Sequence, residues 1–158
     1  MTKKSMESVT NERLLLTKVK HQFIVNMRQA FQDRENLYLI MDLMTGGDLR
    51  YHICKKHKFT EQQARFFCAC IFTGLEYLHE NKILHRDLKP ENLVLDDKGN
   101  IHFNAGYIHL TDLGIAKQLK PENYTDTSGT PGYMAPEVMC RQNHSFEVDY
   151  YALGVILY

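Results

Sequence analysis

The chain has 158 residues, of which 44% are hydrophobic and 24% are charged, and its formal net charge is zero. This composition excludes an intrinsically disordered chain and allows one ordinary domain or part of a larger one. A net charge of zero also provides no overall field that would attract nucleic acid or an acidic membrane.

The first half of the chain predicts two long helices with a strand pair between them. Apolar residues recur at close to a helical period from Ser5 to Lys18. Strands are predicted for Phe23 to Phe31 and Leu37 to Asp42, joined as an antiparallel hairpin, and a short helix begins at Leu49. Thr60-Glu61-Gln62-Gln63 has the form of a capping box, and the apolar spacing after it predicts a helix that ends near Asn81.

The second half predicts short strands at Leu93 to Leu95 and Tyr107 to Leu110, next to turns at residues 96–99 and 104–106. A strongly apolar helix is predicted from Ser145 to Tyr158.

One run of residues is more specific than any other feature. His85-Arg86-Asp87-Leu88-Lys89-Pro90-Glu91-Asn92 is followed by Asp112-Leu113-Gly114 and then by Ala135-Pro136-Glu137. In this order the three stretches resemble the catalytic loop, the metal-binding motif and the end of the activation segment of a eukaryotic protein kinase. Lys89 and the stretch from Gly129 to Met134 match the serine/threonine type. The stretches Gly46 to His52 and Gly129 to Glu137 look most like the cAMP-dependent-kinase-like (AGC) group, with the calcium/calmodulin-dependent kinases as the nearest alternative.

The resemblance implies an α+β fold of the protein kinase-like two-lobe type, present in part. Residues 1–42 would be the remainder of the N-terminal lobe, residues 43–48 the hinge and residues 49–158 a truncated C-terminal lobe. Glu12 would pair with a lysine on a preceding strand, but neither that lysine nor a glycine-rich loop precedes it. We therefore expect the domain to be incomplete at both ends.

The resemblance also assigns catalytic roles, which suit the chemistry of phosphoryl transfer, because that reaction depends on positioning and charge stabilisation. Asp87 would orient the substrate hydroxyl and accept its proton, and Lys89 would hold the γ-phosphate of ATP. Thr130 would bridge these two residues. Asn92 and Asp112 would supply the oxygen ligands that Mg²⁺ prefers.

The nucleotide would lie against the hinge. Met41 would close the back of the adenine pocket, the backbones of Asp42 and Met44 would meet the adenine edge, and Val94 would lie under the ring. Asp48 would reach the ribose or a basic substrate side chain, or would cap the helix that begins at Leu49. Glu91 is placed in the same site, and with Asp48 it hints at basic residues before the phosphoacceptor.

Regulation is expected in residues 115–137, which resemble an activation loop. Arg86 is suited to hold a phosphate on this loop, either at Thr125 or at Thr127, unless Asp126 supplies part of the charge constitutively. Asp149 would hold the catalytic loop from beneath.

The sequence departs from the family pattern in two places. Leu113 stands where phenylalanine is common, and we expect it to stack in a regulatory column with Leu16, Met27 and His85. Residues near Asn100 to Gly106 look inserted. His102 and His109 nearby have no arrangement of ligands that indicates a metal.

We therefore expect a serine/threonine kinase that uses ATP and Mg²⁺ on protein substrates, with an upstream activating kinase as a further partner and no nucleic acid. The alternative is an inactive, truncated kinase-like interaction module that binds a partner through its uncovered residues 155–157. The four cysteines, Cys54, Cys68, Cys70 and Cys140, lack a paired spacing, so we expect free thiols. No signal peptide, lipidation signal or membrane span is recognisable, and we therefore expect a location in the cytoplasm or nucleus.

Overall fold

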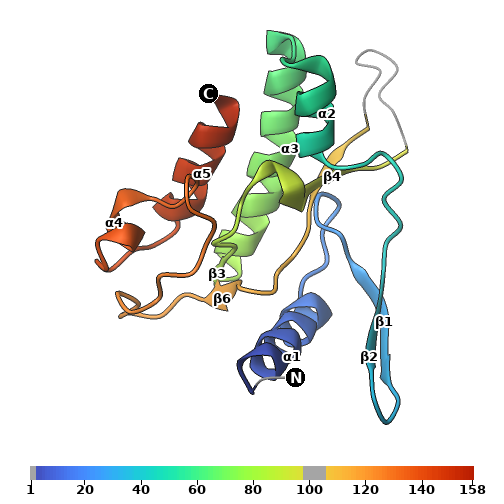
Figure 1. Cartoon of the computed structure of the whole chain (residues 1–158), viewed down its shortest axis with the longest axis vertical. Coiled ribbons are helices and arrows are strands. Elements are labelled where there is room, and N and C mark those ends of the chain that lie inside the picture. The colour runs from blue at the N-terminus through green and yellow to red at the C-terminus, as the bar shows by residue number, and fades with distance from the viewer. Residues whose placement is uncertain (1–2, 98–105) are drawn as a thin grey trace.

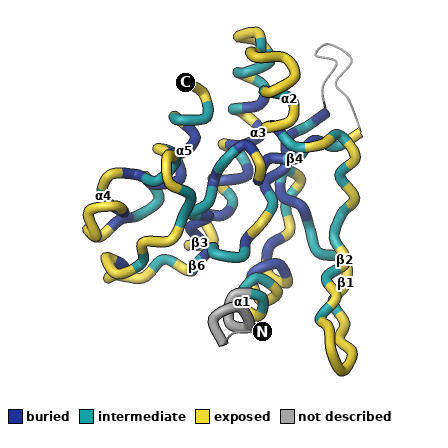
Figure 2. The backbone as a smooth tube through the Cα atoms, viewed as in Figure 1, coloured by how far each residue is buried: buried dark blue, intermediate teal, exposed yellow. Residues whose placement is uncertain are grey.

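The computed structural model describes residues 3–97 and 106–158, with the side chains described from Val9 onward. Its smaller part contains helix α1 (Lys3–Lys18) and a hairpin of strands β1 (Met27–Gln32) and β2 (Leu37–Met41), which lie together on one side of the molecule (Figure 1). The two strands pair antiparallel, with Gln32 opposite Leu37, which confirms the predicted hairpin. The hairpin tip is exposed (Figure 2).

The prediction that the first strand begins at Phe23 is wrong, because the segment before Met27 forms a turn. The side-chain amide of Asn26 donates hydrogen bonds to the backbone carbonyls of His21 and Ile24, at 3.0 and 2.9 Å. Ile24 then forms a parallel bridge with Leu110, in which the backbone N–H of Leu110 donates to the carbonyl of Phe23 at 2.9 Å. This turn fastens the smaller part to the larger one.

Helix α3 (Glu61–Glu80) runs through the middle of the larger part (Figure 1), and the shorter helix α2 (Leu49–Lys56) precedes it. The predicted capping box is present, because Thr60 and Gln63 bond to each other's backbone N–H groups. One face of α3 is buried, as its apolar spacing predicted, and its least exposed apolar side chains are Phe67, Cys70, Ile71, Leu75 and Leu78.

The remaining elements are short and surround α3. Strand β3 (Ile83–Leu84) pairs antiparallel with β6 (Lys117–Gln118), and β4 (Leu93–Leu95) pairs antiparallel with β5 (Ile108–Leu110). The 3₁₀ turn η1 (Pro90–Asn92) precedes β4, and helices α4 (Pro136–Met139) and α5 (Glu147–Leu157) close the chain. These observations confirm, to within two residues, the two strands predicted after residue 92 and the predicted final helix. The inserted residues and the turns beside them lie largely outside the described residues.

The main core joins the two parts of the molecule. Leu16 of α1, Leu113 and the buried face of α3 belong to one apolar cluster, and Met27 packs at its edge. Leu113 is 1% exposed, so an apolar residue suits the position. Three members of the predicted column, Leu16, Met27 and Leu113, thus belong to or pack against one cluster, while the stacking of the whole column with His85 stays a prediction.

Two expectations about the chain as a whole can be checked on the described residues. All four cysteines are free, as predicted, with Cys54 and Cys140 exposed and Cys70 buried. Among the helices that the structure describes, none has the length and apolar character needed to cross a membrane.

Candidate active site

The backbone between β3 and η1 is held by Asp149, which lies in α5 and is 1% exposed. Its Oδ2 accepts a hydrogen bond from the backbone N–H of His85 at 2.9 Å, and its Oδ1 accepts one from that of Arg86 at 2.8 Å. Arg86 has a φ of 69°, a conformation that a residue other than glycine keeps only where its surroundings fix it. The predicted support of the loop by Asp149 is confirmed.

His79, in the last turn of α3, is a second partner of Asp149 that the sequence did not indicate. Its Nε2 lies 2.8 Å from Oδ2 of Asp149, and the two residues are seventy positions apart. Burial acts to raise the pKa of Asp149. The hydrogen bonds from His79 and from the loop backbone outweigh burial, so the pKa of this carboxyl lies below its usual range. No local spacing predicts such a contact.

Four of the predicted catalytic residues form one hydrogen-bonded cluster. Lys89 Nζ donates to Asp87 Oδ2 at 2.7 Å and to Thr130 Oγ1 at 2.9 Å. The hydroxyl of Thr130 donates to Asp87 Oδ1 at 2.5 Å, so Thr130 bridges Asp87 and Lys89 as predicted. The side-chain amide of Asn92 donates to the backbone carbonyl of Asp87 at 2.9 Å and to its Oδ2 at 3.1 Å.

This cluster keeps Asp87 ionised. Burial acts to raise the pKa of Asp87, but the hydrogen bonds from Lys89 and Thr130 and the charge of Lys89 lower it below the usual range. The hydrogen bond to Asp87 in turn raises the pKa of Lys89, against the effect of desolvation. The site therefore presents a carboxylate and an ammonium group side by side, which can orient a hydroxyl and hold an anion.

Asp112 follows β5 and is exposed, with a φ of 62°. The backbone N–H of Thr111 donates to the carbonyl of Asn92 at 3.0 Å, which brings the two predicted metal ligands to neighbouring backbone positions. Since the side-chain nitrogen Nδ2 of Asn92 faces Asp87, the side-chain oxygen Oδ1 of Asn92 is left for another partner. Across the described residues no group of three histidine, cysteine or acidic side chains could hold a metal. Two oxygen ligands suit Mg²⁺, which keeps waters and binds substrate phosphates.

The residues predicted for the nucleotide site lie at the end of β2, in the segment that follows it, in η1 and in β4. Asp42 uses its carboxylate within the fold, because the amide of Asn26 donates to it at 3.2 Å and Arg28 pairs with it. The backbone carbonyl of Asp42 and the backbone groups of Met44 make no hydrogen bond with the described residues. They are therefore available to a ligand. Met41 ends β2 and is half-buried.

Asp48, directly before α2, and Val94 of β4 are brought together by an antiparallel bridge. Oδ1 of Asp48 accepts a hydrogen bond from the backbone N–H of Tyr51 at 2.7 Å, which confirms the capping interpretation. Glu91 is exposed in η1, with Nε of Arg50 at 4.0 Å. The structure thus places Asp48 next to Val94 of β4.

Glu12 forms no ion pair with the side chains that the structure describes. Burial raises the pKa of Glu12, and the charge of Asp112 raises it further. This is the behaviour of a half-buried carboxylate that has no cation beside it among the described side chains. The predicted lysine partner is absent from the described residues.

In the predicted activation loop, the two candidate phosphorylation sites and the aspartate between them differ in exposure. Thr125 and Thr127 are exposed, whereas Asp126 is half-buried and turns toward Arg86. Lys117 of β6 also binds Asp126, with Nζ 2.7 Å from Oδ1. The sequence did not indicate Lys117, because nine residues separate it from Asp126 and no helical or strand period links them.

Comparison with known proteins agrees with this geometry. Residues 1–158 match the sequence profile of the protein kinase domain family. The chain is 41% identical over 155 residues to the cAMP-dependent protein kinase catalytic subunit of Dictyostelium discoideum, covering 98% of the chain and 23% of that protein. It is 43% identical over 162 residues to rhodopsin kinase of Rattus norvegicus, covering 99% of the chain and 28% of that protein.

A third relative is the serine/threonine-protein kinase Sgk1 of Danio rerio, with 42% identity over 161 residues that cover 100% of the chain and 36% of that protein. The chain thus spans well under half the length of each of these three relatives.

Proposed function

The chain belongs to the protein kinase domain family, and we propose that it carries the catalytic centre of a serine/threonine kinase of the cAMP-dependent-kinase-like group. The reaction transfers the γ-phosphate of ATP to a serine or threonine hydroxyl of a protein substrate. The observation that carries this proposal is the cluster of Asp87, Lys89, Thr130 and Asn92. In it the side chains of Lys89, Thr130 and Asn92 each donate a hydrogen bond to the carboxylate of Asp87.

Each member of the cluster has a distinct role in the proposal. Asp87, kept ionised by Lys89, orients the substrate hydroxyl and accepts its proton at a carboxylate oxygen. Lys89 holds the transferred phosphate, and its charge offsets the negative charge there. Thr130 fixes the relative position of the two, because it bonds to both.

Members of this family use ATP and a divalent cation, and we assign the cation as Mg²⁺. When bound, Mg-ATP supplies the phosphoryl group and a cation that offsets the phosphate charge. Oxygens of Asn92 and Asp112 would hold the cation. The nucleotide site would be formed by the last two residues of the N-terminal lobe, by two residues of the hinge and by two positions of the C-terminal lobe: Met41, Asp42, Met44, Asp48, Glu91 and Val94.

The division of the chain follows from this assignment. Residues 1–42 belong to the N-terminal lobe, 43–48 to the hinge and 49–158 to the C-terminal lobe. The four free cysteines support a reducing compartment, and we place the protein in the cytoplasm or nucleus.

The test measures transfer from labelled ATP to peptides that differ only in a serine, threonine or tyrosine acceptor, with the protein expressed at its full length. We expect transfer to serine and threonine, loss of transfer when the cation is chelated and recovery when Mg²⁺ is restored. Asp87→Asn should lower turnover by about 10³-fold while ATP affinity is retained. The matched control is Asp97→Asn, which changes an exposed carboxylate.

Two results would contradict the proposal. Undiminished turnover by Asp87→Asn would remove Asp87 from the mechanism. Binding of Mg-ATP without any transfer would instead favour the non-catalytic interaction module.

A further inference from the structure

The guanidinium group of Arg86 is buried, with 5% of the side chain exposed, directly before Asp87 in the chain. Its Nε donates to the backbone carbonyl of Ile115 at 2.7 Å, and Nη2 donates to the same carbonyl. Within the described part of the chain, Nη1 has no hydrogen-bond partner. A buried cation requires a counter-charge, since removing a charge from water is costly.

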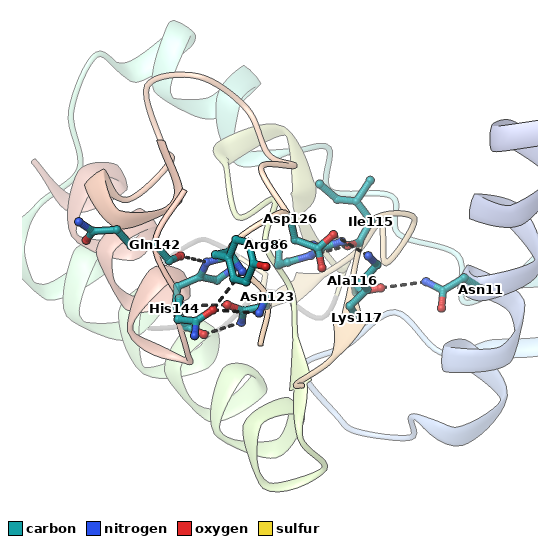
Figure 3. A network of polar contacts seen from close by, with 11 residues as sticks. Asn11, Arg86, Ile115, Ala116, Lys117, Asn123, Asp126, Gln142 and His144 are labelled. Atoms are coloured by element: carbon teal, nitrogen blue, oxygen red, sulfur yellow. Dashed lines mark hydrogen bonds and ion pairs between the residues drawn. The ribbon is translucent and has the colours of Figure 1, made fainter. Parts of the chain in front are cut away.

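Asp126 supplies that counter-charge from a segment forty residues later. Its Oδ2 lies 3.6 Å from Nη1 of Arg86, and its Oδ1 accepts a hydrogen bond from Nζ of Lys117 at 2.7 Å. Burial acts to raise the pKa of Asp126, but the hydrogen bond from Lys117 and the charges of Arg86, Lys117 and His144 lower it. The carboxylate is therefore held ionised between two cations, Arg86 of the loop between β3 and η1 and Lys117 of β6 (Figure 3).

The backbone around Asp126 is fixed independently of these charges. The N–H of Asp126 donates to the carbonyl of Asn123 at 2.8 Å, which closes a turn. The side chain of Asn123 bonds twice to the backbone of His144, accepting from its N–H at 2.9 Å and donating to its carbonyl at 2.5 Å. Figure 3 shows this pair beside the Arg86 network. The turn presents the carboxylate at residue 126 and leaves Thr125 and Thr127 exposed.

The Arg86 network also extends toward the smaller part of the molecule. Ile115, which receives the guanidinium, is followed by Ala116, and the carbonyl of Ala116 accepts a hydrogen bond from Nδ2 of Asn11 in α1 at 2.8 Å. Figure 3 shows Asn11 directed at this carbonyl. Asp126 is therefore linked to the catalytic loop through Arg86 and to β6 through Lys117. The backbone of Ile115 and Ala116 connects this network to Asn11 of α1.

We propose that Asp126 is a positioning residue that orders residues 112–130 by pairing with Arg86 and Lys117, without any phosphate on this segment. The catalytic centre is then assembled in the unmodified chain, because the ordered segment places Thr130 against Asp87 and Lys89. Phosphorylation of Thr125 or Thr127 would add charge beside a site that is already paired. The proposal rests on the proposed kinase activity for its meaning, but the order of the segment can be measured without that activity.

The experiment compares amide hydrogen exchange in residues 119–129 and peptide phosphorylation for four proteins expressed at full length. These are the phosphatase-treated wild type, verified by mass spectrometry to lack phosphate on Thr125 and Thr127, and the variants Asp126→Asn, Asp126→Glu and Glu122→Gln. Glu122 is the matched control, because it is an exposed carboxylate in the same segment with no charged partner among the described residues. Thermal unfolding of each protein shows whether the remainder of the fold is intact.

We expect the backbone amides of residues 119–129 to exchange slowly in the unphosphorylated wild type and in Glu122→Gln, and we expect the two proteins to be equally active. Asp126→Asn should exchange at least about tenfold faster in this segment and lose turnover with an unchanged KM for ATP. Asp126→Glu should recover most of both properties, because it restores the charge, and this recovery would exclude a merely local effect of altered packing.

Three outcomes would overturn the proposal. The first is loss of order in the wild type once phosphate is removed, and the second is wild-type exchange in Asp126→Asn. The third is an Asp126→Glu variant as poorly protected as Asp126→Asn. If no protein in the set transfers phosphate, the proposed function fails while the exchange data still decide the role of Asp126.

Discussion

Asp149 accepts a hydrogen bond from the backbone N–H of Arg86 at 2.8 Å across sixty-three residues of sequence. The same carboxylate accepts from the backbone N–H of His85 and contacts the ring of His79, so its buried charge is fully partnered. The conformation of the catalytic loop is therefore determined by a residue of the last helix. This relationship couples the geometry of the loop to the stability of the chain through the carboxylate of Asp149.

Replacing Asp149 with asparagine should destabilise the chain by about 3 kcal/mol, because an amide NH₂ would face N–H donors in a buried site. Urea unfolding measures the effect. Glu147→Gln is the matched control in the same helix and should change stability by less than about 0.5 kcal/mol, since Glu147 is exposed. A cost for Asp149→Asn no larger than that of the control would show that the carboxylate does not fix the loop.

The stabilising effect of Asp149 should also depend on pH. Its folded-state pKa is lowered, so the unfolded chain binds more protons than the folded chain in acid. The contribution is then complete above the unfolded pKa of about 3.9 and is lost as the pH falls through the folded pKa. The stability difference between wild type and Asp149→Asn should therefore be constant from pH 7 to 5 and narrow below pH 4. A difference that grows in acid would contradict this sign.

The sequence predicted the parts of the fold that local patterns determine. The capping box at Thr60, the apolar face of α3 and the hairpin after residue 27 each depend on residues a few positions apart. The same is true of the catalytic loop, because its residues are contiguous. The bridge by Thr130 was available only through resemblance to a family, since forty-one residues separate Thr130 from Lys89.

The sequence did not predict contacts between distant polar side chains. His79 and Asp149 are seventy residues apart, and no periodicity marks a histidine at a helix end as a buried partner. The predicted start of the first strand was wrong for a related reason. Phe23 to Val25 is apolar enough for a strand, but the side chain of Asn26 bonds back to His21 and makes a turn.

Glu12→Gln should stabilise the chain at neutral pH, because burial and Asp112 penalise the charged form of Glu12. Its folded pKa is raised, so the folded chain binds more protons than the unfolded chain, and stability falls as the pH rises from the unfolded pKa of about 4.3 through the folded pKa. The gain should be a fraction of about 1 kcal/mol, since solvent screens a half-buried group. Urea unfolding from pH 4 to 7 tests this, with the exposed Glu35→Gln as control. A destabilised Glu12→Gln at pH 7 would indicate a cationic partner.

Two helical glycines should respond in opposite directions to alanine. A Cβ on Gly74 of α3 would lie 2.4 Å from Cδ1 of Leu110 and 3.2 Å from the carbonyl of Phe23, so Gly74→Ala should cost about 1–3 kcal/mol. A Cβ on Gly154 of α5 would have no atom within 4 Å, and Gly154→Ala should gain up to about 1 kcal/mol in helix propensity. Thermal unfolding of both variants decides the matter. Equal shifts for the two would show that α3 and β5 are not in close contact.

Thr130→Val should lower turnover by about tenfold to a hundredfold with little change in ATP affinity, because the hydroxyl donates to Asp87 and accepts from Lys89. Thr130→Ser keeps the hydroxyl and should retain most activity. Thr10→Val, at an exposed position of α1, controls for the general effect of replacing threonine by valine. Steady-state kinetics with varied ATP separate the effects on turnover and KM. If valine raised the KM for ATP and left turnover unchanged, Thr130 would contribute to nucleotide binding, and the arrangement of Asp87 with Lys89 would not depend on it.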